Sequence, residues 1–238
     1  MDFFSESPPT QWAGEQSLRE KVLEKIRFAV VSGESPPGTV LSVPGVAKQL
    51  GISTTPVREA LLELCSDGLI APMRNRGFRV VQASLQDLRD LFAMREQLET
   101  YAVGIVAATG LKDKARLEEL AGVVGEAVQK GDMYQYLSAD RAFHQALVSQ
   151  AGNRLLTHTV MRLRDNMRLY GLDSEEGLVR QHASVKEHYH LVKLLDEGHG
   201  DKAATLMRVH IRDWEPVFSA GIRQFREAAE NHAAGAKR

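Results

Sequence analysis

Four side chains in the second half of the chain have the residue types of a transition-metal site. Asp140 and His144 are four positions apart, which places them one turn apart on one face of a helix. His188 and His210 each have apolar residues three or four positions away, so both are predicted to point inward. One carboxylate and three imidazoles can hold a divalent transition metal with coordination positions left open.

Other interpretations of these residues stay open at this point. An inward histidine is also commonly a hydrogen-bonded core residue, although burying four such groups without a shared partner is costly. A metal-dependent hydrolase is a second alternative, but the chain has no His-Glu-x-x-His motif. Glu187 lies one residue round the helix from His188 and is expected to point about 100° away. A regulator that senses the metal directly is the third alternative.

The elements that must position these residues form a helical region over 84–230. Ser84 to Asp87 has the form of a capping box, and helical patterns continue from there without a convincing strand. The predicted breaks are at Thr109-Gly110, Lys130-Gly131, Ala151–Asn153, Tyr170–Ser174 and Gly198–Gly200. We therefore expect an all-helical bundle of six to seven helices, followed by a frayed end over 231–238.

The region 15–83 has a different pattern, and residues 1–14 are predicted to be a mobile tail. A helix runs from Glu15 to Gly33, and a short strand is expected over 39–41. Two short helices follow, over 43–50 and 56–67, and then a hairpin around a basic turn at 73–77. This order predicts a winged helix-turn-helix, so the whole chain is expected to be mainly α with one small β hairpin.

The second helix of such a pair presents polar and basic side chains to base edges. The predicted DNA-contacting residues lie at its N-terminal end and in the wing: Ser53, Thr54, Thr55, Arg58, Arg74, Arg76 and Gly77. Arginines in the wing can reach phosphates or the minor groove. The alternative is a small α/β subdomain with a basic loop and no role in DNA binding.

Composition agrees with an intracellular protein of two domains. The 238 residues carry 30 Lys and Arg against 31 Asp and Glu, so the net charge is −1. The region 15–83 nevertheless has nine basic and seven acidic residues, which gives +2. The single cysteine, Cys65, excludes a disulfide framework and fits the cytoplasm. No apolar run has the length of a membrane span, so no membrane partner is expected.

The sequence of residues 17–82 resembles the DNA-binding domain of the GntR family of bacterial transcriptional regulators. The specific part is Thr55-Pro56-Val57-Arg58-Glu59-Ala60-Leu61, with Asn75-Arg76-Gly77-Phe78 in the wing. The resemblance implies that Arg58 and the Arg76-Gly77 tip contact DNA and that a homodimer binds a near-palindromic operator. Gly45 and Thr54 stand where the family usually has arginines, so the operator preference is expected to differ.

Residues 85–225 resemble the FCD effector domain of the FadR-type branch of these regulators. The resemblance rests on Asp140-x-x-x-His144, Ala151-Gly152-Asn153, Glu187-His188 and Arg208-Val209-His210-Ile211. It implies that Asp140, His144, His188 and His210 hold Zn²⁺ or Ni²⁺. It also implies that a small organic acid binds near the metal and changes operator affinity. The cations and amide proposed to pair with this acid are Arg95, Arg162 and Asn166, with Arg164 as a further candidate.

Overall fold

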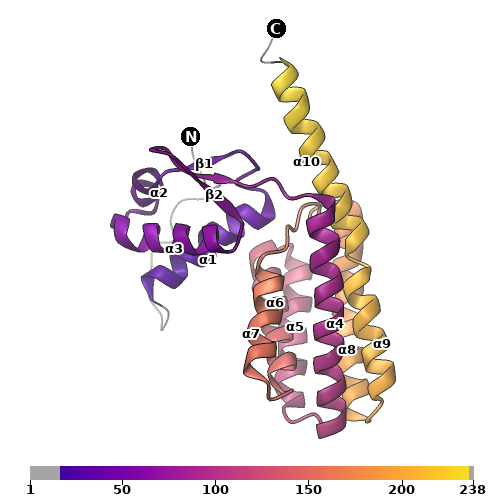
Figure 1. The fold of residues 1–238 in the computed structure, drawn as a ribbon. Coiled ribbons are helices and arrows are strands. Elements are labelled where there is room, and N and C mark those ends of the chain that lie inside the picture. Colours follow the sequence, from indigo (N-terminus) through magenta and orange to yellow (C-terminus); the bar gives the residue numbers. More distant parts are fainter. Residues whose placement is uncertain (1–16, 236–238) are drawn as a thin grey trace. The chain divides into compact units, whose positions relative to one another are not determined.

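The structure is a computed structural model that describes residues 17–235 (Figure 1). The chain forms two compact units, and each is described by itself. Unit 1 comprises the chain up to Leu85, the short segment Asn166–Tyr170 and the chain from Ala220 onward; unit 2 comprises Gln86–Asp165 and Gly171–Ser219. The predicted junction at 83/84 lies close to the first crossing between units, but two segments that we assigned to the helical region belong to unit 1.

Unit 1 is built from three helices and a small sheet in the described part of residues 17–85. The helices are α1 (Leu18–Ser32), α2 (Val43–Leu50) and α3 (Thr54–Ser66). The strands are β1 (Val40–Leu41), β2 (Ile70–Met73) and β3 (Gly77–Val80), in the antiparallel order β1-β3-β2. Apolar side chains from all three helices and from the sheet form one buried core. The predicted winged helix-turn-helix is confirmed, and its wing is a three-stranded sheet.

Local chemistry explains where the helices of unit 1 begin and end. Ser42 caps α2 by accepting a hydrogen bond from the Gly45 amide at 3.1 Å. Gly51 ends the same helix in the left-handed conformation, with φ of 67°. Ser53 then stands in the extended conformation directly before α3, which turns the chain for the second helix of the pair. The turn between α2 and α3 thus leads into the N-terminal end of α3, where the predicted DNA-contacting residues lie.

Gly77 is required by the wing itself. Its φ is 106°, and a Cβ atom there would lie 2.4 Å from the carbonyl oxygen of Leu41 in β1. A side chain at this position would therefore clash with the backbone of β1, and it would also force a non-glycine residue into a disfavoured positive-φ conformation. The structure gives Gly77 a role in closing the sheet, separate from the DNA contact that we predicted for it.

Gly77→Ala is expected to destabilise the protein by at least the roughly 1–3 kcal/mol of a strained backbone conformation. Thermal and urea unfolding measure the loss. Gly51→Ala is the matched control, because Gly51 also has a positive φ but open space around its Cβ position. A loss no larger for Gly77→Ala than for Gly51→Ala would contradict the close-approach argument.

The second half of the chain is helical throughout the described residues. The helices are α4 (Leu85–Thr109), α5 (Lys114–Lys130), α6 (Met133–Ser149), α7 (Arg154–Asp165), α8 (Glu175–Asp196), α9 (Gly200–Arg212) and α10 (Glu215–Gly235). Within unit 2, α5 packs against α6 and α8, α6 packs against α7, and α8 packs against α9. The predicted all-helical fold class of this region is confirmed.

The ends of the last two helices differ from the sequence prediction. The sequence pattern gave one helix after Gly200, but the chain breaks at Asp213-Trp214. Pro216 has no N–H to donate to the carbonyl of Arg212, so α9 cannot continue through it, and it stands instead in the first turn of α10, where no such bond is needed. Helix α10 continues to Gly235, past the predicted limit at 230, whereas the predicted tail 1–14 and residues 236–238 lie outside the described residues. Among the described helices, none combines the length and apolar character needed to cross a bilayer.

Candidate metal centre and nucleic-acid interface

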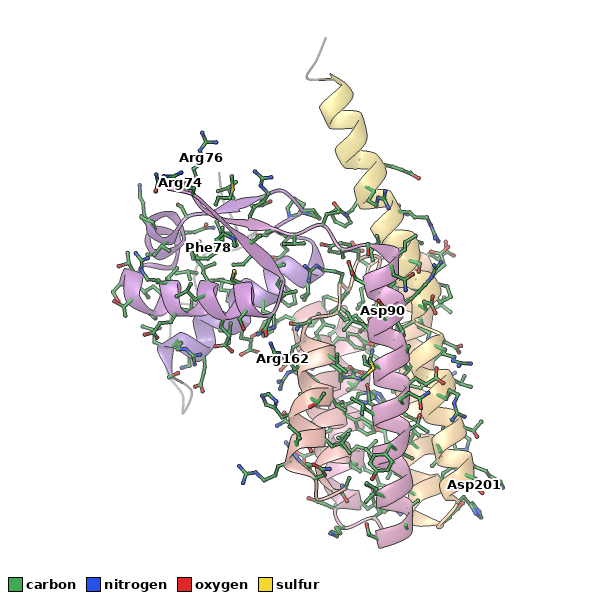
Figure 2. The ribbon with its side chains drawn as sticks, in the orientation of Figure 1. Arg74, Arg76, Phe78, Asp90, Arg162 and Asp201 are labelled. Atoms are coloured by element: carbon green, nitrogen blue, oxygen red, sulfur yellow. The ribbon has the colours of Figure 1, made fainter. Side chains whose placement is uncertain are left out.

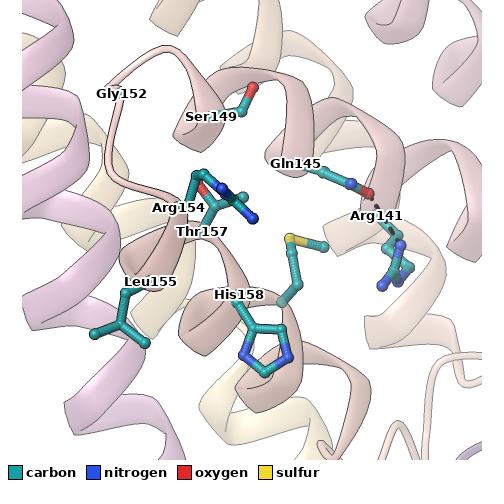
Figure 3. Close-up of a pocket in the computed structure, with 9 residues that line it drawn as sticks. Arg141, Gln145, Ser149, Gly152, Arg154, Leu155, Thr157 and His158 are labelled. Carbon is teal, nitrogen blue, oxygen red and sulfur yellow. Dashed lines mark hydrogen bonds between the residues drawn. The ribbon is translucent and has the colours of Figure 1, made fainter.

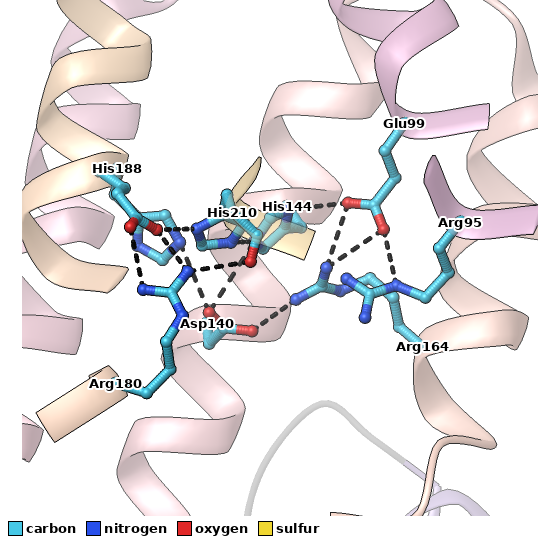
Figure 4. A network of polar contacts seen from close by, with 9 residues as sticks. Arg95, Glu99, Asp140, His144, Arg164, Arg180, His188 and His210 are labelled. Atoms are coloured by element: carbon cyan, nitrogen blue, oxygen red, sulfur yellow. Dashed lines mark hydrogen bonds and ion pairs between the residues drawn. The ribbon is translucent and has the colours of Figure 1, made fainter. Parts of the chain in front are cut away.

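Three helices of unit 2 bring the four predicted metal ligands together (Figure 4). Asp140 and His144 lie one turn apart on α6, His188 lies on α8, and His210 lies near the end of α9. The three histidine side chains are buried, which confirms that they point inward. His190, two residues after His188 on α8, is exposed.

The donor atoms of these residues surround one point. The Nε2 atoms of His144 and His210 are 3.2 Å apart. The Oδ1 atom of Asp140 lies 3.5 Å from Nε2 of His188 and 3.8 Å from Nε2 of His144. Each histidine offers a nitrogen within 4.8 Å of those of the other two. Ligand atoms bonded to one tetrahedral zinc ion lie about 3.4 Å apart, so the spacing fits a single ion.

His188 is the residue that most needs a further partner. Its ring stacks on Phe143 with the ring centroids 4.0 Å apart, and the side chain is fully buried. Neither of its ring nitrogens has a hydrogen-bond partner among the described residues. A buried polar atom without a partner costs about 1–3 kcal/mol. The buried His144/His188/His210 triad is therefore consistent with a metal site.

The electrostatics give these groups the protonation states that a metal requires. Burial, with Arg164 nearby, lowers the pKa of His144 to about 4, and burial holds the pKa of His188 well below its usual value. Burial alone would raise the pKa of Asp140, but Arg164 and the histidines lower it further than burial raises it. At neutral pH the site thus offers the neutral imidazoles of His144 and His188 and the carboxylate anion of Asp140.

Two glutamates that the sequence analysis missed contact the far nitrogens of the histidines. Glu99 of α4 places Oε2 2.9 Å from Nδ1 of His144, and Glu187 of α8 places Oε2 2.7 Å from Nδ1 of His210. Such carboxylates fix the tautomer of a ligating histidine and leave Nε2 free for the metal. Glu187 does turn away from His188, as we predicted, but it reaches the histidine of the neighbouring helix.

Three arginines neutralise the buried carboxylates of this network. Arg164 contacts Glu99 at 3.1 Å and Asp140 at 2.5 Å, and Arg95 donates from Nε to Glu99 at 2.8 Å. Arg180 binds both carboxylate oxygens of Glu187, at 2.9 and 2.6 Å. Burial raises the pKa of Glu99, but Arg95 and Arg164 reverse this and hold it well below the usual value. The carboxylates are therefore ionised and locked in position.

The predicted effector residues are not all in one place. Arg95 is buried inside the network, and Arg164, the further candidate, joins it to the metal ligands. Arg162 is exposed (labelled in Figure 2). Asn166 belongs to unit 1, where its side chain accepts a hydrogen bond from Arg27 at 2.9 Å. Of the four candidates, Arg95 and Arg164 are the ones that lie in the network around the predicted metal ligands.

A separate groove of about 780 Å³ is lined by residues of α6, α7 and the turn between them (Figure 3). It includes Arg141, Arg154, His158 and Met161, and none of the predicted site residues. Arg141 is already held by Asp165 through two contacts of 2.6 and 2.9 Å. We therefore treat this groove as distinct from the candidate metal centre.

All the predicted DNA-contacting residues except the half-buried Gly77 are exposed on unit 1. Ser53, Thr54, Thr55 and Arg58 are exposed at the N-terminal end of α3. Arg74 and Arg76 are exposed in the turn between β2 and β3 (Figure 2). Neither these two nor Arg58 forms an ion pair with any described residue. Their charge is available to an anionic polymer such as DNA.

Comparisons with known proteins agree with both halves of the chain. Residues 18–80 match the model of the bacterial regulatory proteins of the gntR family, and residues 90–213 match the FCD domain. The chain is 32% identical over 148 residues to the HTH-type transcriptional regulator McbR of Escherichia coli K12, covering 62% of this chain and 67% of that protein. It is 27% identical to the HTH-type transcriptional repressor RspR of the same strain, covering 92% and 94% of the two chains.

A solved structure shows the same fold. The structure of E. coli McbR/YncC superposes with a TM-score of 0.70 at 24% identity, covering 90% of this chain and 99% of that one.

Proposed function

We propose that this chain, which belongs to the GntR family of bacterial regulatory proteins and carries an FCD domain, controls transcription through a carboxylate effector bound at a divalent metal. The family consists of transcriptional regulators, so the chain is a regulator and not an enzyme, as predicted. We propose further that the regulator binds operator DNA as a homodimer in the cytoplasm. An effector in the helical unit then changes operator affinity by a coupling of about 1–3 kcal/mol.

The observation that supports the metal is the buried cluster of His144, His188 and His210, with Asp140 Oδ1 3.5 Å from Nε2 of His188. Neither ring nitrogen of His188 has a hydrogen-bond partner among the described residues. Asp140 Oδ1 and the Nε2 atoms of His144, His188 and His210 would hold the ion. Histidine and carboxylate donors suit Zn²⁺ or Ni²⁺. When bound, the ion supplies a Lewis-acidic centre with positions open to an oxygen ligand.

Charge balance supports an anionic effector. Arg95, Arg164 and Arg180 match Glu99, Asp140 and Glu187 in number, and His144 and His188 are neutral. A divalent ion therefore adds two positive charges that the described network does not compensate. A small carboxylate would neutralise this charge by binding the ion and pairing with Arg95 or Arg164. Arg162 is exposed and Asn166 belongs to unit 1, so neither is assigned to the effector here.

Metal analysis of the purified protein tests the first step. We expect about one zinc or nickel ion per chain in the wild type, and loss of most of it in His188→Ala, because that variant removes one of four donors. His190→Ala is the matched control, since His190 is exposed two positions away on the same helix. The absence of stoichiometric metal from both the wild type and His190→Ala would refute the metal centre.

A thermal-shift screen of small organic acids tests the second step. An effector at a hundredfold excess over its Kd stabilises the metal-loaded protein by about 2.7 kcal/mol. The same acid should give no shift with the His188→Ala protein. An acid that stabilises both proteins equally binds elsewhere and speaks against a metal-bound effector.

A further inference from the structure

A short segment from the second half of the chain, Asn166–Tyr170, is built into unit 1; we call it the buried segment. It directly follows α7 and contains no helix or strand. Segments without regular structure usually run over the surface. Met167, Arg168 and Tyr170 are instead only 6%, 5% and 1% exposed. The buried segment is therefore a packed part of unit 1.

The first residue of the buried segment is linked to α1 and to the end of α3. The Oδ1 atom of Asn166 accepts a hydrogen bond from Nη1 of Arg27 on α1 at 2.9 Å. Nη2 of Arg27 contacts Oδ2 of Asp67, also at 2.9 Å, and the side chains of this ion pair are 15% and 8% exposed. Asp67 directly follows α3, the helix that carries Arg58. One guanidinium group thus joins the buried segment to the helix predicted to read bases.

The later residues of the buried segment bind the base of the wing and α1. Nη2 of Arg168 donates to the carbonyl oxygens of Leu69 at 3.3 Å and of Val81 at 3.4 Å. Leu69 directly precedes β2, and Val81 directly follows β3. The amide of Leu169 donates to the carbonyl oxygen of Val31, near the end of α1, at 2.9 Å. The buried segment therefore contacts α1, the end of α3 and both strands of the wing hairpin at their base.

The residues directly before the buried segment are fixed in unit 2 by the network around the metal ligands. Arg164, in the last turn of α7, contacts Oδ2 of Asp140 at 2.5 Å and Oε2 of Glu99 at 3.1 Å (Figure 4). Asp165, the last residue of α7, is held by Arg141 through two contacts of 2.6 and 2.9 Å. The end of α7 is thus anchored on one side of the connection, and the buried segment is anchored on the other.

The connection between these anchors is very short. Arg164 and Asn166 are two residues apart, so their Cα atoms are separated by at most about 7 Å. A displacement of Arg164 must therefore be passed on to Asn166. The connection between β3 and α4 is different, because residues 82–84 have no helix or strand and Gln82 is exposed. Backbone rotation in such a stretch can absorb a displacement.

We infer that the buried segment transmits the state of the metal centre to the DNA-binding residues, and that Asn166 is the positioning residue that passes it through Arg27 to Asp67. This role rests on the proposed function, because it takes Arg164 as a partner of the metal-bound carboxylate. A ligand shifts a conformational equilibrium only if it interacts differently with the two states. An acid that pairs with Arg164 competes with Asp140 for the guanidinium group, and this competition supplies the difference.

The affinity of the full-length protein for operator DNA, measured with and without zinc, tests the role of Asn166. The metal alone is the probe, and the DNA is the region upstream of the protein's own gene. For the wild type we expect the zinc-loaded and chelator-stripped proteins to differ in affinity by at least about fivefold. For Asn166→Ala the two affinities should become nearly equal, while the zinc content stays at the wild-type level, because Asn166 is not a predicted metal ligand.

Two further variants separate transmission from a general loss of stability. Asn166→Asp keeps an oxygen acceptor for Arg27, so it should restore the wild-type response to zinc. Gln86→Ala is the matched control, because it removes an exposed amide side chain just after the other connection, where Gln86 donates to Asp90 of its own helix at 2.8 Å. It should respond to zinc as the wild type does. Thermal unfolding verifies that each variant is folded.

Amide hydrogen exchange follows the transmission through unit 1. Zinc should change the exchange rates of wild-type peptides that cover 166–170 and 62–69. In Asn166→Ala the change should persist in 166–170 and disappear from 62–69, because the link through Arg27 to Asp67 is lost. A change that persists in both peptides would show that the signal reaches α3 by another route and would overturn the role of Asn166.

The proposed function and the role of the buried segment fail on different results. A wild type that holds no metal, or that does not bind operator DNA, contradicts the proposed function. A wild type that does both, beside an Asn166→Ala protein that responds to zinc as Gln86→Ala does, removes the role of the buried segment alone. An operator affinity of the wild type that is independent of zinc also removes that role and leaves metal and DNA binding in place.

Discussion

Glu99→Ala is expected to lower the free energy of unfolding by about 3–5 kcal/mol, the usual cost of removing one partner from a buried ion pair. The Glu99 carboxylate is fully buried and contacts Arg95, Arg164 and His144. Without it, Arg95 and Arg164 both lose the buried carboxylate that they contact, and Asp140 still pairs with Arg164. The unfolding midpoint of a chain of this size falls by about 2–4 °C for each kcal/mol.

The same substitution should weaken the metal site. Glu99 orients His144 through Nδ1, and loss of such a contact typically lowers metal affinity 10- to 100-fold. Glu99→Gln is the informative companion, because it keeps the size of the side chain and one oxygen acceptor but loses the charge. Glu119→Ala is the control: Glu119 is 62% exposed in a pair with Arg116, so its loss should hardly change the midpoint.

Calorimetric unfolding and competition with a chelator measure the two effects. If Glu99→Ala and Glu119→Ala have the same unfolding midpoint and the same metal affinity, Glu99 stabilises neither the fold nor the metal site. A lower midpoint with unchanged metal affinity would assign Glu99 to stability alone.

The sequence analysis found the predicted metal ligands because their signals are local. Asp140 and His144 share a helix face by spacing, and apolar neighbours mark His188 and His210 as inward. Glu99 and Glu187 gave no such signal, since each contacts a histidine on a different helix. A search for charged residues at inward positions would have found Glu99, whose side chain lies with Arg95 on the buried face of α4.

Fold prediction succeeded and failed for similar reasons. The turns at Gly33, Gly51 and Gly131 end helices at the positions that the glycines indicated, each with a positive φ. The break at Trp214 was missed because the apolar period continues across it and only Pro216 signals the interruption. The pairing of β1 with β3, which joins Val40 to Arg79, links segments that no short-range pattern connects.

The two departures from the family pattern occupy defined places in unit 1. Gly45 lies in the first turn of α2, where its amide binds the Ser42 cap, and Thr54 is the first residue of α3. Arg58 is consequently the basic side chain left in the first half of α3, one turn after Thr54. Base recognition by this helix should therefore depend more heavily on Arg58 than it would with two further arginines.

Arg58→Ala is accordingly expected to weaken operator binding at least tenfold. A bidentate contact from arginine to guanine is worth about 1–3 kcal/mol, and a dimer would lose one in each half-site. Fluorescence anisotropy with the DNA upstream of the protein's own gene, and with a scrambled duplex, measures the effect. The ratio of the two affinities should fall, because a base contact carries sequence information whereas a phosphate contact does not.

Arg74→Ala in the wing is the matched comparison, since Arg74 is also exposed but belongs to the turn between β2 and β3. A phosphate contact predicts uniformly weaker binding to both duplexes and a salt slope lower by about one. The two variants thus separate reading of bases by α3 from attachment of the wing to the backbone. Equal losses on the operator and the scrambled duplex for Arg58→Ala would place Arg58 on phosphate, and sequence preference would then have to come from Ser53, Thr54 and Thr55 or from the shape of the DNA.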